Sequence, residues 1–151
     1  MAVDERGEHW LRRLDADAWL RAARTELAAG EAQLESRRTA VTHARRAAGM
    51  AINAVLMAQA LEGDDMLRWG RSYIDHLRAL ADADAARVHP LSAASRSAAA
   101  QLLAIPVIPA SSALLQLGRS PHSAAQQALT AARELVDDCA EVVARLSSRT
   151  A

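Results

Sequence analysis

The chain has 151 residues, of which 51% are apolar, and its 18 acidic and 18 basic side chains leave no net charge. That length suits one domain able to fold without disulfides or metals, and the neutral balance argues against non-specific nucleic-acid binding. No apolar run approaches the roughly 18 residues of a membrane span, and the N-terminus is too polar for a signal peptide. We therefore expect one cytoplasmic domain over residues 1–151, with residues 1–14 at its periphery.

Apolar side chains recur at helical spacing along most of the chain, which holds 37 alanines and few β-branched or aromatic residues. A first helix is predicted from about residue 17 to 37, with Asp15 or Asp17 as its N-cap. A second is predicted from about 39 to 61. Its alanines and Gly49 favour a closely packed neighbouring helix.

The middle of the chain predicts two shorter helices. The first covers about residues 72–87 and is stopped by Pro90, and the next covers about 92–104. The two prolines in the segment 105–109 favour an extended connector over a strand, and a short turn is expected at 111–117.

The last helix carries the clearest start signal. Ser120 is expected at the N-cap and Pro121 at the first helical position, which suits the missing N–H of proline. Its apolar seam is typical of a core face, although part of so long a helix could serve as a dimer surface: Ala128, Ala132, Leu135, Cys139, Val142 and Leu146. Together the segments predict an all-α fold, a single up-and-down bundle of about five helices.

This order of helices resembles the HEPN superfamily of small helical bundles from prokaryotic toxin–antitoxin systems. The resemblance is carried by Trp19-Leu20-Arg21-Ala22-Ala23 in the first helix and by the stretch 45–56 in the second. A shorter helix around His76-Leu77 and a final one around 124–146 complete it. It implies dimers, and in ribonuclease members a metal-free site in which an arginine precedes a histidine by four to six intervening residues.

The chain departs from that motif where the last helix begins, because only two residues separate Arg119 from His122. The family spacing occurs three times elsewhere, close to the roughly 2 matches that chance predicts, in Arg37 and Arg38 before His43 and in Arg71 before His76. The resemblance therefore implies a HEPN-like bundle whose nuclease centre is missing or displaced, as in members that act as binding modules.

The densest polar cluster lies at residues 69–76. Arg71, Tyr73, Asp75 and His76 could line a pocket for a phosphate or a base, with Arg71 and Asp75 paired on one helix face. The alternative, which we favour, is that Ser72 caps the helix, Tyr73 is half-buried and the charges face water.

Asn53 is a second candidate, because it lies in an apolar stretch and a buried amide needs hydrogen-bond partners. It could bind a base or reach across the bundle. The favoured alternative is a satisfied core amide or an exposed residue on the polar face.

Four arginines form a basic stretch at residues 37, 38, 45 and 46. They could hold a phosphate, but with all 18 basic residues being arginine the signal is weak. We expect them to be solvated and to pair with acids such as Glu35.

The histidines do not predict a metal centre. His43, His76, His89 and His122 lack the spacing and companions of a ligand set, and Cys139 lies on the apolar seam, where a thiol is inert. We expect no metal and no cofactor.

The function predicted from these features is a non-catalytic binding or assembly module. It would form a homodimer or dock onto a partner protein through its alanine-lined faces, with a small polar pocket near Arg71, Tyr73 and His76. The alternatives are a metal-free ribonuclease using Arg71 with His76 or Arg119 with His122, and a nucleotide-binding accessory protein. The net charge does not indicate RNA or nucleotide, and no membrane partner is expected.

Overall fold

The computed structural model describes residues 14–60, 68–82, 91–106 and 121–150, and all regular structure in these ranges is helical. The predicted all-α fold is confirmed. No helix within these ranges has the length and apolarity needed to cross a membrane. The expected turn at 111–117 and the Ser120 cap lie outside the described residues. The helices are α2 (Ala16–Glu31), α3 (Arg37–Gln59), α5 (Tyr73–Ala81), α6 (Ala93–Ala104) and α7 (Pro121–Thr150).

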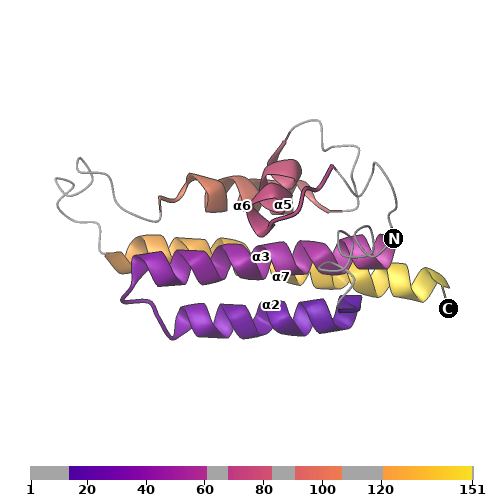
Figure 1. Ribbon diagram of the computed structural model, residues 1–151, viewed down its shortest axis with the longest axis horizontal. Coiled ribbons are helices and arrows are strands. Elements are labelled where there is room, and N and C mark those ends of the chain that lie inside the picture. Colours follow the sequence, from indigo (N-terminus) through magenta and orange to yellow (C-terminus); the bar gives the residue numbers. More distant parts are fainter. Residues whose placement is uncertain (1–13, 61–67, 83–90, 107–120, 151) are drawn as a thin grey trace, which may run out of the picture.

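The three long helices α2, α3 and α7 lie side by side, with α3 in contact with both others (Figure 1). α2 runs opposite to α3, and α7 runs in the same direction as α3. α6 packs on α7 and runs opposite to it, so α2, α3, α6 and α7 form an up-and-down set. α5 is seen almost end-on and crosses between α3 and α6, which it contacts.

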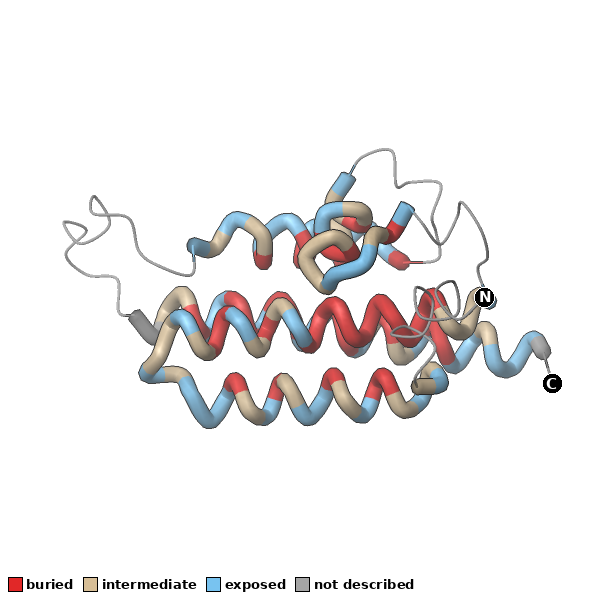
Figure 2. Tube along the Cα trace, in the orientation of Figure 1, coloured by how far each residue is buried: buried red, intermediate tan, exposed pale blue. Residues whose placement is uncertain are grey.

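α3 is the centre of the core and is buried along most of its length (Figure 2). Its small side chains let neighbours approach on several sides, which confirms the close packing expected from its composition. A Cβ atom on Gly49 would lie 2.4 Å from Tyr73 Cβ, so only glycine admits α5 at this point. The fully buried alanines of α3 are Ala40, Ala44, Ala47, Ala48, Ala51 and Ala54.

Local capping sets where the helices begin. Asp15 is the N-cap of α2, and its Oδ1 accepts a hydrogen bond from the N–H of Ala18 at 2.8 Å. Ser36 caps α3, which therefore begins at Arg37, two residues before the predicted start.

Two predicted helix ends are wrong. The first helix ends at Glu31 rather than near residue 37, because the chain turns there and Ser36 starts the next helix. The third ends at Ala81 rather than near residue 87, since Asp82 adopts an extended conformation with φ −66° and ψ 133°.

The seam of α7 is core. Ala128, Ala132, Leu135, Cys139 and Val142 are buried, and Leu146 packs against them at the margin. Burial, with the nearby charge of Asp138, raises the pKa of the Cys139 thiol well above its usual value. The core interpretation of this seam is thus confirmed, and these side chains are not available as a dimer surface.

Candidate functional site

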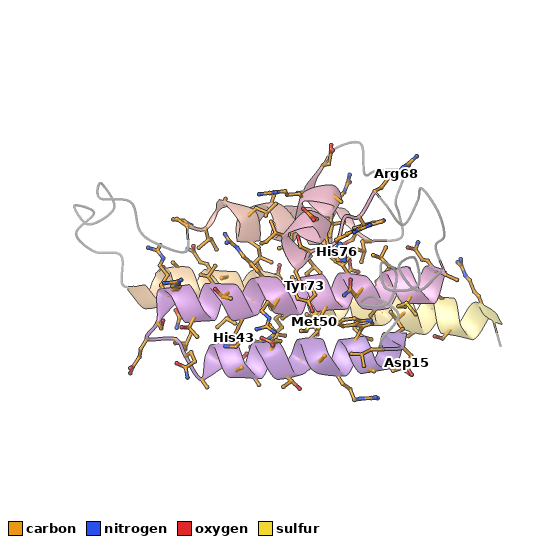
Figure 3. All side chains as sticks on the ribbon, viewed as in Figure 1. Asp15, His43, Met50, Arg68, Tyr73 and His76 are labelled. Atoms are coloured by element: carbon orange, nitrogen blue, oxygen red, sulfur yellow. The ribbon has the colours of Figure 1, made fainter. Side chains whose placement is uncertain are left out.

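The structure divides the residues singled out at 53 and 69–76 into a buried part and an exposed part. Asn53 and His76 lie together in the interior between α3 and α5, and both have no exposed surface. Arg71 is exposed at the start of α5, with the carboxylate of Asp75 close to it. Tyr73 of α5 lies over Gly49 of α3 (Figure 3). The sequence thus selected neighbours that do not share one pocket.

His76 is held on both ring nitrogens. Nδ1 donates to the backbone carbonyl of Trp69 at 2.5 Å, and Nε2 lies 2.6 Å from Oδ1 of Asn53. The indole of Trp69 packs edge-on against the imidazole, with ring centroids 6.3 Å apart. Burial lowers the pKa of His76, against smaller raising effects of the Trp69 carbonyl and Asp75.

The protonation of the His76 ring fixes how it bonds to Asn53. A carbonyl only accepts, so Nδ1 carries a proton, and the neutral ring then presents a lone pair at Nε2. Burial favours that neutral ring. The Asn53 amide must therefore turn its Nδ2 group toward Nε2, an exchange of O and N that leaves the side-chain shape unchanged. In the opposite orientation Nδ2 is buried without a partner among the described residues.

The exposed part of the cluster caps α5. Ser72 is the N-cap, and its Oγ accepts a hydrogen bond from the N–H of Asp75 at 3.1 Å. The expected ion pair between Arg71 and Asp75 is wrong, because Arg71 precedes the helix and its backbone N–H, at 3.2 Å, is what Asp75 accepts. Hydrogen bonds to the carboxylate of Asp75, first from the Ser72 side chain and then from the Arg71 backbone N–H, lower the pKa of Asp75. The structure thus confirms that Ser72 caps the helix and that Tyr73 is half-buried.

A second polar group, which the sequence did not predict, joins three helices. We call it the Glu26 cluster: Glu26 of α2, His43 and Arg46 of α3, and Tyr73 of α5. Glu26 Oε2 lies 2.5 Å from His43 Nδ1, and Oε1 lies 3.4 Å from Arg46 Nη2. Burial raises the pKa of Tyr73, the charge of Arg46 lowers it and that of Glu26 raises it, which places its phenol in the field of both groups. The only sequence signal was the shared helix face of His43 and Arg46.

Arg45 was expected to be solvated, and this is wrong. Its Nε donates to the Leu102 carbonyl at 3.0 Å and its Nη2 to the Ile105 carbonyl at 2.7 Å, at the C-terminal end of α6. Burial of the guanidinium lowers its pKa. Arg45 thus satisfies carbonyls that a helix end leaves unpaired. Arg46, the other arginine of this pair, is exposed and pairs with Glu26 rather than Glu35.

The N-terminal end of α6 is held by Asp138 of α7. Its Oδ2 accepts from the Ser92 N–H at 3.1 Å, from the Ser92 hydroxyl at 2.9 Å and from the Ser95 hydroxyl. Burial would raise the pKa of Asp138, but the bonds from Ser95 and Ser92 outweigh it and lower the pKa. α6 is therefore fastened at its start to α7 and at its end to α3.

Replacing Asp138 tests this attachment. Asp138→Ala is expected to lower the free energy of unfolding by about 1–3 kcal/mol, because it removes the acceptor of three hydrogen bonds at a helix start. The neighbouring exposed Asp137→Ala should change it by less than about 0.5 kcal/mol. Urea denaturation followed by circular dichroism measures both. Equal effects would show that the Asp138 contacts do not stabilise α6.

Arg119, His89 and the side chain of His122 lie outside the described residues. Among the residues that the structure describes, no group of three histidine, cysteine or acidic side chains is placed to hold a metal ion.

Comparison with known proteins gives no match to a family model, a curated protein or a solved structure.

Proposed function

We propose that the chain is a non-catalytic, HEPN-like assembly module that pairs with a second copy of itself through the outer face of α6. The observation that carries the proposal is the make-up of this face. Four of its exposed positions recur at spacings of four, three and four residues and are small and uncharged: Ala93, Ser97, Ala100 and Ala104. The other exposed residues of α6, Ala94 and Gln101, are also uncharged, and the half-exposed Arg96 lies at the margin of this face. The outer faces of α2 and α7 instead carry exposed charges, at Arg21 and Arg24 and at Arg133, Glu134, Asp137 and Glu141.

Self-association suits such a face for two physical reasons. Two copies related by a twofold axis place the same residues opposite one another, and an uncharged face then meets itself without repulsion or desolvation of charge. Alanine and serine also permit a short distance between helix axes. The bonds of Arg45 and Asp138 fix α6 before association, which lowers the ordering cost.

The setting of His76 favours this proposal over the ribonuclease alternative that used Arg71 with His76. A general base must reach the proton that it removes. His76 is buried, its Nδ1 is bonded to Trp69 and its Nε2 faces Asn53. The alanine-lined face of α3 is buried inside the bundle and so cannot serve as the dimer surface. Among the described residues, the exposed alanine-rich face is that of α6.

Sedimentation equilibrium over a wide range of concentration tests the proposal. We expect a monomer–dimer equilibrium, and we expect Ala100→Arg to weaken it by at least about tenfold because a guanidinium would be desolvated at the contact. The matched control is Ala28→Arg on the exposed face of α2, which should leave the dimer unchanged. A wild-type chain that stays monomeric at the highest concentration, or equal effects of the two variants, would overturn it.

A further inference from the structure

We propose that His43 and Arg46 of the Glu26 cluster bind a phosphate group, with Glu26 as a positioning residue and Tyr73 as a wall of the site. The site lies on α2, α3 and α5, so it is separate from the α6 face and does not depend on the proposed dimer. Figure 3 shows His43 between α2 and α3, and Tyr73 over α3, where it contacts Gly49.

The side chains of His43 and Arg46 are more exposed than that of Glu26, which holds them in place. The side chain of Glu26 is 16% exposed, against 24% for His43 and 48% for Arg46. Both oxygens of Glu26 are engaged, Oε2 by His43 and Oε1 by Arg46. The carboxylate is therefore occupied in orienting the ring and the guanidinium, and it presents less of its surface to an anion than they do.

The orienting bonds leave hydrogen-bonding groups available. Glu26 engages Nδ1 of His43, and within the described residues Nε2 has no hydrogen-bond partner. Arg46 is bonded through Nη2 alone, so its Nε and Nη1 donors are unused by those residues. A guanidinium fork suits two phosphate oxygens, and Nε2 can donate to a third oxygen or accept a proton that the phosphate carries.

α3 contributes basic but no acidic side chains to the site. α3 contains Arg37, Arg38, Arg45 and Arg46 and no acidic residue between Arg37 and Gln59. Arg45 is bonded to the end of α6, so Arg46 is the arginine of α3 that meets the cluster, and Glu26 is the acidic residue paired with it.

Tyr73 closes the site on the α5 side. Its ring rests on the backbone at Gly49, one helical turn after Arg46, because a Cβ there would come within 2.6 Å of the ring. Like any tyrosine phenol, its hydroxyl is protonated at neutral pH, and burial raises its pKa further.

Imidazole-detected NMR of the full chain tests the site, with His43→Gln used to identify the His43 resonances. Inorganic phosphate is titrated against potassium chloride of matched ionic strength, and adenosine 5′-monophosphate against adenosine. We expect a saturable shift of the His43 resonances with both phosphate compounds. Tighter binding of the nucleotide would identify a phosphate carried on a nucleoside, and equal binding would identify free phosphate.

Three variants decide whether the cluster is responsible. Arg46→Gln should weaken phosphate binding by about tenfold or more, because a charge-assisted contact is lost. The control is Arg21→Gln, which removes the same charge from an exposed position on α2 and should leave phosphate binding unchanged. Glu26→Gln should shift the His43 Nδ1 resonance before ligand is added, because the ring loses its charged partner, and should alter the pH dependence of phosphate binding. Thermal unfolding confirms that each variant is folded. A shift matched by chloride or adenosine, or unaltered in Arg46→Gln, would overturn the proposal.

Discussion

His76→Ala should lower the free energy of unfolding by about 3–5 kcal/mol, the largest effect expected of any polar side chain in the described residues. The substitution removes a ring with no exposed surface and so leaves a cavity between α3 and α5. It also deprives the Trp69 carbonyl and the Asn53 amide of the partner that lies 2.5 Å and 2.6 Å away. Urea denaturation followed by tryptophan fluorescence measures the loss, since Trp69 packs on the ring.

Two further variants test whether the stability lost in His76→Ala comes from its contact with Asn53. Arg78→Ala, on the exposed side of the same helix, should change stability by less than about 0.5 kcal/mol. Asn53→Ala should be destabilising alone, yet should add much less in the His76→Ala background, because the partner is already gone. Full additivity, or a loss below about 1 kcal/mol for His76→Ala, would show that the two side chains are not coupled.

Local signals made the helix starts predictable from sequence. Asp15, Ser72 and Ser92 each accept a hydrogen bond from a backbone N–H three residues later, and such a cap needs only neighbouring residues. The ends were less predictable. α3 stops at Gln59 because Ala60 takes a left-handed conformation with φ 54°, which a sequence of good helix formers does not indicate.

The contacts between polar residues on different helices could not be predicted from the sequence, for a different reason. Asn53 and His76 were each chosen as a candidate, but their contact joins residues 23 apart on two helices and depends on how α5 crosses α3. Glu26 was not chosen, because its contact with His43 depends on the alignment of α2 with α3. Arg45 was assigned to solvent, since its carbonyl partners belong to the end of α6, about 60 residues later. Periodicity predicts faces, and the packing of those faces decides partners.

Acidification should weaken the fold in a pH range that the burial of His76 defines. Burial lowers the pKa of His76 in the folded chain, whereas the unfolded chain takes up its proton near the ordinary value of about 6.5. Below that pH the unfolded state binds more protons than the folded state. The free energy of unfolding is therefore expected to fall with decreasing pH, by up to about 1.4 kcal/mol per pH unit, until the pH reaches the folded pKa.

Asp75 and Asp138 do not contribute to the change of stability in the pH range assigned to His76. The pKa values of Asp75 and Asp138 are lowered, so the stability that they contribute is lost only as the pH falls below about 4. Urea denaturation at a series of pH values between these limits measures the slope. The control is His76→Phe, which keeps a ring against Trp69 but cannot titrate, and its slope should be shallower than that of the wild type. Equal slopes would mean that His76 is protonated in the folded chain, and hence that the Asn53 oxygen, rather than its amide nitrogen, faces the ring.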